Sequence, residues 1–266
     1  MDGSLGYAPG QAAATQATIA KRVVILGALS AIATATARIY AREGAALVLV
    51  ARNAERLDAL ASDLRARGAA EVEITAVDLE AEAPNAATHL RSWADRLGGL
   101  DHVHIVYGYL GSQPEASTNQ AELARIVTSN FTSAVFWCEA AANIFRQQKR
   151  GSLVAVSSVA GDRGRQSNYA YGAAKGGLAL YVQGLAHSLD GTGARAVAVK
   201  PGFVDTPMTD GLKKGGAMWA TADQIGAALR RAADKGGPIQ YAPGKWRIVM
   251  AVIRAVPAFI FHKTKL

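Results

Sequence analysis

The 266-residue sequence predicts a single-domain, doubly wound α/β fold in which helices cover both faces of a parallel sheet. Two observations support this prediction. Short β-branched segments alternate with Ala/Leu/Arg-rich stretches of helical spacing as far as about residue 206. No repeat or low-complexity linker divides the chain, and its length and 50% hydrophobic content suffice for one core. Ligands of such a fold lie beyond the carboxyl ends of the strands.

The predicted elements follow each other in a regular order. The predicted strands cover residues 22–28, 46–52, 72–78, 102–108, 152–158 and 194–202. Two of the intervening helices are expected to end at Gly44 and Gly68, because glycine commonly follows the last helical residue. Residues 1–20 are expected to form a flexible extension before a domain of residues 21–266. Within that domain, residues 207–266 are expected to form a substrate loop, a helix and an apolar, basic C-terminal segment.

Charge and cysteine content narrow the expected partners and location. The net charge of +8 is concentrated in residues 207–266, where ten basic residues stand against three acidic ones, so an anionic partner would meet that part. We expect no nucleic acid among the partners. Cys138, the single cysteine, lies in an apolar helical stretch and is expected to be a small buried hydrophobe, which fits a reducing cytoplasm. No apolar run reaches the roughly 18 residues that span a bilayer, and we expect no secretion signal.

The turn after the first predicted strand, within ILGALSAIATATA, is expected to bind the phosphates of a dinucleotide. In such a turn, backbone amides and a helix N-terminus meet the pyrophosphate. The residues expected to contact the cofactor here are Gly27, Leu29, Ser30, Ala31 and Ile32. Ala31 and Ala33 stand where further glycines are usual, so a tight strand-to-helix turn without a ligand explains the same residues.

Two further strand ends carry residues that fit the ribose and the adenine. Arg52 follows the second strand, where a site selective for NAD carries an acid, and a guanidinium there can pair with a phosphate on the ribose. The sequence therefore predicts NADP(H) in preference to NAD(H), with a solvated arginine at a helix start as the alternative. Asp78 can accept a hydrogen bond from the adenine amine while Leu79 packs nearby, although aspartate is also a common helix cap.

Three residues near the fifth strand predict proton-transfer chemistry. Ser158 ends that strand, and Tyr171 and Lys175, four residues apart, share one face of the following helix. The Lys175 ammonium is expected to lower the pKa of the Tyr171 phenol. Tyr171 would then give a proton to a carbonyl oxygen, or take one from an alcohol, while Ser158 holds that oxygen. A bound cofactor would carry the hydride.

Together these motifs resemble the short-chain dehydrogenase/reductase family over about residues 21–208. That family has a serine, then a Tyr-x-x-x-Lys motif thirteen residues on, matched here by Ser158, Tyr171 and Lys175. The resemblance implies a Rossmann-like sheet and an NAD(P)-dependent enzyme whose cofactor also contacts the tyrosine and the lysine. It further implies that Asn130 supports a water leading to the lysine, although a local backbone bond also explains this residue. The segment PGFVDTPM resembles the family's nicotinamide-binding segment, which implies cofactor contacts for Pro201, Gly202, Val204 and Thr206.

One departure from the family points to a subgroup. The usual Asn-Asn-Ala-Gly after the fourth strand is replaced by YGYLG, so Tyr107, Gly108 and Tyr109 are expected to line the adenosine side of the pocket. YGYLG, SNYAYGAAKGGL and the tail YAPGKWRIVMAVIRAVPAFIF together resemble decaprenylphosphoryl-2-keto-ribose reductases. That resemblance implies reduction of the keto group of a lipid-linked pentose, which completes, with a partner oxidase, the epimerisation of ribose to arabinose.

The C-terminal residues 246–266 allow two interpretations. Apolar side chains alternate there with basic ones and no acid is present, a mixture that suits peripheral contact with an anionic lipid surface. The alternative is that this segment covers the core or a subunit contact. The apolar residues are Trp246, Ile248, Val249, Ile253, Phe259 and Ile260, and the basic ones are Arg247, Arg254, Lys263 and Lys265.

Several other features bear on function. His102 and His104 are expected to be structural residues at a strand edge, and no metal site is expected. Arg163 and Arg165 lie on a loop that borders the substrate, either to hold a substrate phosphate or as solvated side chains. The alternatives to the lipid-linked substrate are a soluble one, such as a 3-oxoacyl thioester or a small alcohol, and a non-catalytic nucleotide sensor. The family resemblance also implies a homo-oligomer.

Overall fold

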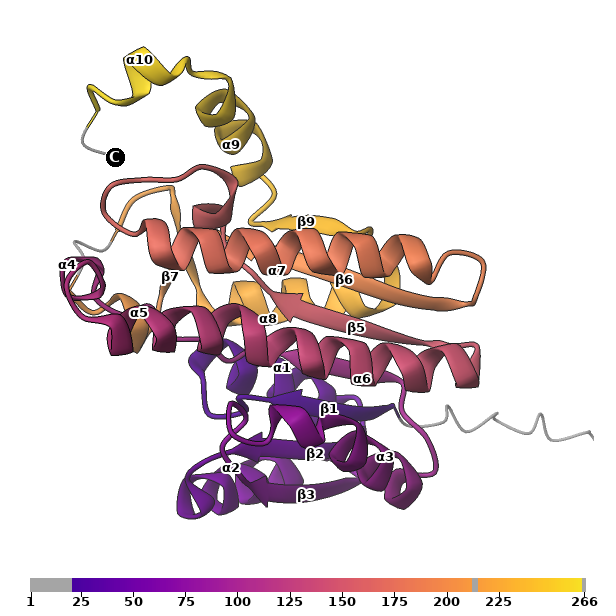
Figure 1. Cartoon of the computed structure of the whole chain (residues 1–266). Coiled ribbons are helices and arrows are strands. Elements are labelled where there is room, and N and C mark those ends of the chain that lie inside the picture. Colours follow the sequence, from indigo (N-terminus) through magenta and orange to yellow (C-terminus); the bar gives the residue numbers. More distant parts are fainter. Residues whose placement is uncertain (1–20, 212–214, 265–266) are drawn as a thin grey trace, which may run out of the picture.

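A computed structural model describes residues 21–211 and 215–264 of the chain, so the predicted extension of residues 1–20 lies outside the described residues. The doubly wound α/β fold is confirmed: a parallel sheet has helices on both faces (Figure 1). The strands of this sheet are β1 (Arg22–Leu26), β2 (Ala46–Ala51), β3 (Glu71–Ala76), β4 (His102–Ile105), β5 (Gly151–Val156), β6 (Ala194–Pro201) and β9 (Ile239–Ala242). Their spatial order is β3-β2-β1-β4-β5-β6-β9.

From β1 the chain adds β2 and β3 toward one edge of the sheet, and it then returns to place β4 on the other side of β1. The direction in which strands are added therefore reverses between β1 and β4, which pair in parallel. Open sheets of this kind bind ligands in the crevice at that reversal. The six predicted strands are all present, whereas β9 was not predicted: it pairs with β6 and extends the sheet beyond residue 206. A separate two-stranded sheet pairs β7 (Phe203–Asp205) with β8 (Trp219–Thr221).

Successive side chains along each strand point to opposite faces of the sheet and pack in two apolar cores. Val23 and Ile25 face one core, which the helices α1 (Ala31–Arg42), α2 (Ala54–Ala66) and α8 (Ala222–Lys235) complete. Val24 and Leu26 face the other core, completed by α3 (Ala86–Leu97), α6 (Ser133–Gln148) and α7 (Tyr169–Ser188). Because both faces are covered, the strands are apolar on both sides, as parallel sheets require.

Local signals in the sequence explain several helix ends. Gly44 and Gly68 follow α1 and α2 with φ values of 72° and 104°, a backbone region that glycine adopts without a steric penalty. Both predicted helix ends are therefore found. Cys138 is fully buried in α6, and burial raises the pKa of its thiol, so it packs as the predicted small hydrophobe.

The prediction that His102 and His104 lie at a strand edge is wrong. Both lie on β4 in the middle of the sheet, and His104 is fully buried. The Tyr40 hydroxyl on α1 is 2.7 Å from Nδ1 of His102 and 2.8 Å from Nε2 of His104. The two histidines are thus part of a buried polar cluster, and no group of three potential metal ligands occurs among residues 21–211 and 215–264.

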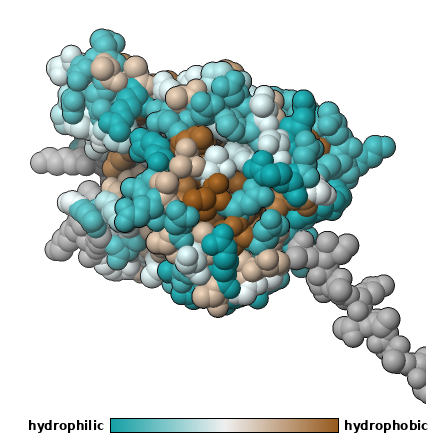
Figure 2. All heavy atoms as spheres, turned by 90° about the horizontal axis from the view of Figure 1, so that it is seen from below, coloured by the Kyte–Doolittle hydropathy of each residue, from teal (hydrophilic) through white to brown (hydrophobic). Residues whose placement is uncertain are grey.

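The sheet edge at β3 is protected by charge. Glu71 and Glu73 lie on this strand, and Glu73 accepts a hydrogen bond of 2.8 Å from Arg96 on α3. Figure 2 shows the molecule from this side: most of its surface is hydrophilic, with a small apolar hollow near the centre. Charged side chains at an edge strand oppose pairing with another sheet.

At the other end of the sheet, beyond β9, lie the C-terminal helices α9 (Trp246–Ala255) and α10 (Ala258–Phe261) (Figure 1). Trp246 and Met250 are buried and pack against Val159, so one face of α9 covers the body of the protein. Ile248 and Val252 are 72% and 62% exposed on the opposite face. Of the helices in the part of the chain that the structure describes, none is long and apolar enough to span a bilayer.

Candidate active site

The turn after β1 is shaped by Gly27 and capped by Ser30. Gly27 has a φ of 82°, and a Cβ there would lie 2.6 Å from Cβ of Tyr107, so only glycine fits. The Ser30 hydroxyl accepts a hydrogen bond of 3.2 Å from the amide of Ala33 and caps α1. The amides of Ala31 and Ile32 remain as the first donors of the helix, which have no partner within it.

The missing glycines do not distort this turn. Ala33 is fully buried between α1 and the sheet, where its methyl group packs in the apolar core. The close contact of α1 with α8 is provided by Gly226 instead, because a Cβ there would lie 2.9 Å from Cβ of Ala35. The helix N-terminus therefore faces the pocket, with alanine in place of glycine.

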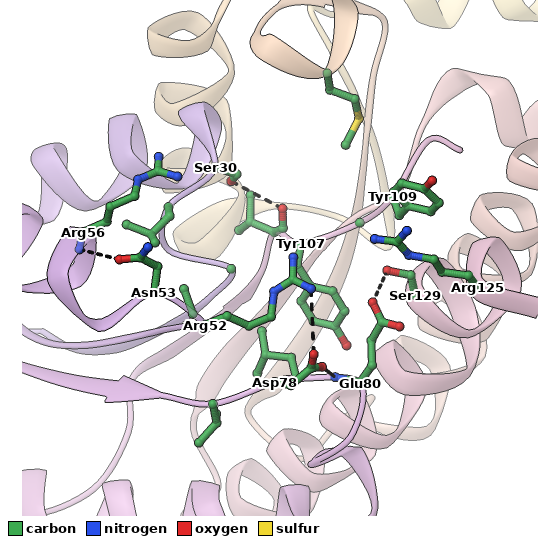
Figure 3. Close-up of a pocket in the computed structure, with 18 residues that line it drawn as sticks. Ser30, Arg52, Asn53, Arg56, Asp78, Glu80, Tyr107, Tyr109, Arg125 and Ser129 are labelled. Carbon is green, nitrogen blue, oxygen red and sulfur yellow. Dashed lines mark hydrogen bonds and ion pairs between the residues drawn. The ribbon is translucent and has the colours of Figure 1, made fainter. Parts of the chain in front are cut away.

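One end of the pocket is strongly basic. Arg52 follows β2, is 71% exposed, and lies 3.8 Å from a carboxylate oxygen of Asp78, which follows β3. Arg56 on α2 and Arg125 on the helix α5 (Gln120–Val127) stand on opposite sides of Arg52 (Figure 3). Three arginines thus line the end of the pocket where a ribose and its substituents would lie in this fold.

The Asp78 carboxylate and Leu79 have additional structural roles. Asp78 accepts a hydrogen bond of 2.8 Å from the amide of Glu80, so it also closes the local turn. Leu79 is buried, and its carbonyl accepts a hydrogen bond of 2.9 Å from Trp137 on α6. Both residues line the basic end of the pocket.

The segment 107–111 forms the floor of the pocket, but its tyrosines are not free. The Tyr107 hydroxyl is 3.0 Å from the Ser133 hydroxyl, and burial raises the pKa of Tyr107. The Tyr109 hydroxyl donates a hydrogen bond of 3.1 Å to Glu122, while the Arg125 guanidinium lies 3.9 Å from the centre of the Tyr109 ring. These contacts hold both rings in place and leave the backbone of this segment facing the pocket.

Asn130 fixes the same segment from behind. Its side-chain oxygen accepts a 3.1 Å hydrogen bond from the Tyr109 amide, and its nitrogen donates to the carbonyls of Tyr109 and Ile126, at 2.5 and 2.8 Å. Asn130 is fully buried and lies in the π-helical turn Thr128–Thr132, the kind of irregularity that often occurs at functional sites. A Cβ on Gly108 would lie 2.7 Å from Oδ1 of Asn130 and 3.1 Å from Nζ of Lys175. There is therefore no room for a side chain at position 108 between Asn130 and Lys175.

The side chains of the predicted catalytic group lie together next to Gly108. The group consists of Ser158, Tyr171 and Lys175. Ser158 follows β5, and Tyr171 and Lys175 come from the first turns of α7. Close contacts between backbones bring the elements together, because a Cβ on Gly172 would lie 2.8 Å from the carbonyl oxygen of Ala160, and one on Gly176 would lie 2.7 Å from that of Gly161. The three side chains line one cavity of about 460 Å³, within the usual size range of ligand pockets.

The protonation behaviour of this group differs from the prediction. Burial raises the pKa of Tyr171 to about 12, and a hydrogen bond with Ser158 acts in the opposite direction. Lys175 does not lower it: its ammonium donates a hydrogen bond of 2.9 Å to the carbonyl of Val156 and lies 6.0 Å from the centre of the Tyr171 ring. Burial lowers the pKa of Lys175 to about 8. Desolvation, which opposes charge, therefore outweighs the expected attraction.

The segment after β6 forms the opposite wall of the cavity. Its predicted residues Pro201, Gly202, Val204 and Thr206 all line the same cavity as Tyr171. The indole of Trp246 packs against Gly202, where a Cβ would overlap the ring. Burial of Trp246 therefore links α9 to the cavity wall and excludes this residue from the exposed apolar surface that the sequence suggested.

The two arginines of the loop before α7 have different surroundings. Arg163 donates hydrogen bonds to the carbonyls of Ile253, Arg254 and Val256, at 3.1, 2.9 and 2.7 Å, so it caps the end of α9. Its guanidinium also lies 4.2 Å from the centre of the Phe261 ring. Arg165 instead lines the cavity beside Tyr171.

The structure thus brings almost all of the predicted site residues to one crevice, and only Asn130 lies behind its wall. It adds residues that the sequence did not suggest. Among them are Asn53, Arg56, Leu110, Arg125, Asn168 and Met208. Arg56 could have been found, since it lies four residues after Arg52, in the first turn of α2. Arg125 reaches the site only through the packing of α5.

Comparison with known proteins agrees with this geometry. The family model described as short chain dehydrogenase matches residues 21–216. The chain belongs to the short-chain dehydrogenase family. It is 38% identical to an uncharacterized oxidoreductase of Mycobacterium tuberculosis, over 92% of this chain and 98% of that protein. It is 30% identical to a 3-oxoacyl-[acyl-carrier-protein] reductase of Bos taurus, over 73% of this chain and 80% of that protein.

A solved structure shows the same architecture. The short-chain dehydrogenase from Sphingobium yanoikuyae, in complex with NADPH, superposes with a TM-score of 0.76 at 26% identity, covering 90% of this chain and 97% of that one. As a short-chain dehydrogenase/reductase, the chain is an oxidoreductase. Its serine, tyrosine and lysine occupy the crevice at the reversal of the sheet.

Proposed function

We propose that the chain is an NADP(H)-dependent reductase that converts a ketone to a secondary alcohol. The observation that carries this proposal is a single crevice with the Ser158, Tyr171 and Lys175 group at one end and three arginines at the other. The N-terminus of α1 lies between these two ends. This arrangement suits a ligand with phosphates in its middle and a reactive ring at one end.

The residues present fit a nicotinamide dinucleotide phosphate. The amides of Ala31 and Ile32 would hold the pyrophosphate, and Gly27 lets the backbone approach it. Arg52 would pair with the ribose phosphate, with Arg56 and Arg125 adding positive charge, while Asp78 would accept from the adenine amine. When bound, the cofactor supplies the hydride. This arginine set supports the preference for NADP(H) over NAD(H).

The chain's own residues would supply the proton and the geometry. Tyr171 would donate its phenolic proton to the substrate oxygen, which Ser158 would hold by a hydrogen bond. Lys175 would hold the cofactor ribose and restore the proton on Tyr171. Asn130 would act through the fixed 107–111 segment, since its side chain is occupied by Tyr109 and Ile126.

For the substrate, we propose the keto group of a lipid-phosphate-linked pentose, formed by a partner oxidase in the first half of an epimerisation. The subgroup resemblance of YGYLG and of the C-terminal segment supports this proposal. The exposed face of α9 and α10 supports it as well, because Ile248, Val252 and Phe259 are 72%, 62% and 70% exposed, with Arg247 and Lys263 beside them. Such a surface would place the cavity wall formed with Trp246 close to anionic lipid.

Retention on vesicles tests the membrane contact. Vesicles of phosphatidylglycerol should retain the protein more than vesicles of phosphatidylcholine, and the double variant Ile248→Ser, Val252→Ser should reduce that retention. Both side chains are largely exposed and neither belongs to the apolar cluster around Trp246 and Met250, so we expect folding to be preserved. Equal retention of the variant and the wild type would contradict this part of the proposal.

We also propose that two chains pair through α6 and α7. Phe136 on α6 and Leu180 on α7 are 48% and 69% exposed, and a groove on this face is lined by Phe131, Leu180 and Tyr181. Light scattering at working concentration should therefore report a dimer or a larger oligomer, and a monomer would contradict the proposal.

A soluble ketone is the second candidate substrate. The similarity to a 3-oxoacyl-[acyl-carrier-protein] reductase favours it, and acetoacetyl thioesters are the corresponding probe. The third reading, a nucleotide sensor without catalysis, would leave the buried group of Ser158, Tyr171 and Lys175 without a purpose.

The deciding experiment compares the wild type with Tyr171→Phe, using NADPH fluorescence for binding and NADPH oxidation for turnover. The substrates are a lipid-phosphoryl 2-keto-pentose, generated by an oxidase, and acetoacetyl thioester. We expect turnover that falls by a factor of about 10² to 10⁴ in the variant, with NADPH affinity unchanged. NADPH binding without turnover of either substrate would contradict both substrate assignments, and an absence of NADPH binding would contradict the function itself.

A further inference from the structure

Arg165 is a positive charge in the catalytic cavity that the protein itself leaves unpaired. It lines the same cavity as Ser158 and Tyr171, and its Nε is buried without a hydrogen-bond partner. Among residues 21–211 and 215–264, its side chain makes no hydrogen bond or ion pair. Arg165 as a whole is partly buried, but its Nε is shielded from solvent without a partner. A guanidinium keeps its charge, so this desolvation costs free energy that a ligand can recover.

The neighbouring carboxylate does not meet this need. Asp162 acts on Arg165 only through its charge, and burial of Arg165 outweighs this and lowers the pKa of its guanidinium. One oxygen of Asp162 is bound by the Lys200 ammonium, and the other accepts a hydrogen bond of 2.7 Å from the Tyr241 hydroxyl. Arg163, two residues before Arg165, differs in that its guanidinium is engaged in hydrogen bonds to carbonyls at the end of α9.

A second unpaired group lies in the same cavity. The side-chain oxygen of Asn168 is buried without a partner, although Asn168 precedes α7 in the position where a side chain usually caps a helix. Asn168 and Arg165 both line the cavity next to Tyr171. An acceptor and a strong donor without partners, at the place where the ketone must bind, indicate a ligand that carries complementary groups.

We infer that Arg165 recognises an oxyanion on the substrate, a phosphate ester or a carboxylate, while Asn168 accepts a hydrogen bond from a substrate hydroxyl. The inference rests on the proposed function for the position of the ketone, and it narrows the substrates to anionic hydroxyketones. The cofactor phosphates do not need Arg165, because the N-terminus of α1 and Arg52 are available to them. Guanidinium and oxyanion form two parallel hydrogen bonds, the strongest pairing open to an arginine.

The test uses two probes of nearly equal size, 4-oxocyclohexanecarboxylate and its neutral carboxamide. Binding of each to the protein is measured by calorimetry, with and without saturating NADPH, for the wild type, Arg165→Gln, Arg165→Lys and Arg163→Gln. We expect the wild type to bind the carboxylate at least about tenfold more tightly than the carboxamide. Arg165→Gln should remove this preference, Arg165→Lys should keep part of it, and Arg163→Gln should keep it in full. NADPH affinity should be the same in all four proteins.

The outcomes separate this inference from the proposed function. Equal affinity for the two probes in the wild type, no binding of either, or an unchanged preference in Arg165→Gln, would each overturn the inference. A protein that fails to bind NADPH contradicts the proposed function instead, and the titrations without NADPH still decide the role of Arg165.

The source of the anion is resolved by a second comparison. 4-Oxocyclohexyl phosphate, free in solution, is compared with a lipid-phosphoryl 2-keto-pentose in detergent micelles, using kcat/KM for both. A loss of at least about tenfold in Arg165→Gln for the lipid-linked substrate assigns Arg165 to its phosphodiester, and the same loss for the free phosphate alone assigns it to a soluble phosphorylated ketone. No loss with either substrate would overturn the inference.

Discussion

Burial controls the protonation of the two residues on α7 that would handle the proton. Tyr171 keeps its proton because its pKa is raised to about 12, whereas Lys175 has a pKa lowered to about 8. The phenol of Tyr171 therefore stays protonated throughout the physiological range, and the charge of Lys175 is what changes there. The spacing of the two residues predicted instead that the Lys175 ammonium would lower the pKa of Tyr171.

The first prediction concerns the pH dependence of ketone reduction. Because Lys175 loses its proton as pH rises through about 8, the charge that, in the proposed function, would hold the cofactor ribose and resupply the proton is lost above that pH. We expect kcat/KM to be constant below about pH 8 and to fall by about tenfold per pH unit above it. In Lys175→Arg, whose guanidinium stays charged, the residual activity should not show this decline. A wild-type profile that stays flat to pH 9.5 would contradict the assignment.

The second prediction concerns cofactor choice. Replacing Arg52 by glutamine removes the guanidinium that is available to the ribose phosphate; this side chain is 71% exposed, and its ion pair with Asp78 is 3.8 Å long, so we expect little change in packing. NADPH should bind about tenfold or more weakly, and NADH affinity should change by less than about twofold. Arg91→Gln, an exposed arginine on α3, is the matched control and should alter neither affinity. Equal losses for both cofactors would show that Arg52 supports the fold and does not select the phosphate.

At the level of elements, the approach of α7 to the turn Val159–Asp162 positions the tyrosine. The third prediction tests this contact with Gly176→Ala, whose new Cβ would lie 2.7 Å from the carbonyl oxygen of Gly161. We expect a loss of about 1–3 kcal/mol in the free energy of unfolding and a fall in kcat, because α7 must move away from Ser158.

The matched control is Gly184→Ala, on the same helix, where a Cβ meets nothing within 4 Å. Alanine is the better helix former, so this variant should gain about 0.5–1 kcal/mol and keep its kcat, with light scattering used to show that its assembly is unchanged. Urea unfolding and initial rates measure both variants. If Gly176→Ala behaved like Gly184→Ala, the close contact would have no role in placing Tyr171.

Features of the elements could be predicted from the sequence where they depend on residues close together in the chain, and not where they depend on contacts between distant segments. The six predicted strands and the order Ser158, Tyr171, Lys175 follow from side-chain spacing within one element and its neighbour. The short strand β9 follows α8 after three residues, outside the regular alternation that ends near residue 206, so its pairing with β6 could not be recognised. The burial of Trp246 and the reach of Arg125 into the pocket depend on packing between distant segments, and no pattern in the chain records them.

On the scale of the whole molecule, the sheet carries a buried polar cluster between its central strand β4 and helix α1. Tyr40 joins His102 and His104 there, and Arg230 on α8 lies 4.9 Å from the centre of the Tyr40 ring. None of these four residues lines the catalytic cavity. The effect of the cluster is therefore expected on stability and not on turnover.

The last prediction is that this cluster makes the fold sensitive to mild acid. Burial lowers the pKa of His102 from its ordinary value of 6.5 to about 4; Lys21 and Arg230 act in the same direction, and Asp234 and Asp101 oppose them. The folded protein therefore holds this imidazole neutral at a pH where the unfolded chain binds a proton. Stability from this group is complete above about pH 6.5 and decreases as the pH falls toward 4. Between pH 6.5 and 5 the loss amounts to about 2 kcal/mol.

Urea unfolding of the wild type and of His102→Asn at pH 7 and pH 5 isolates this contribution. Asparagine places an amide near the position of Nδ1, so the Tyr40 hydroxyl keeps a partner. The variant should be less stable at pH 7, since it packs less well, but it should lose about 2 kcal/mol less than the wild type between pH 7 and pH 5. The carboxylates that also titrate in acid are common to both proteins and cancel in the difference. Equal losses in the two proteins would show that His102 is not the group that couples the fold to pH.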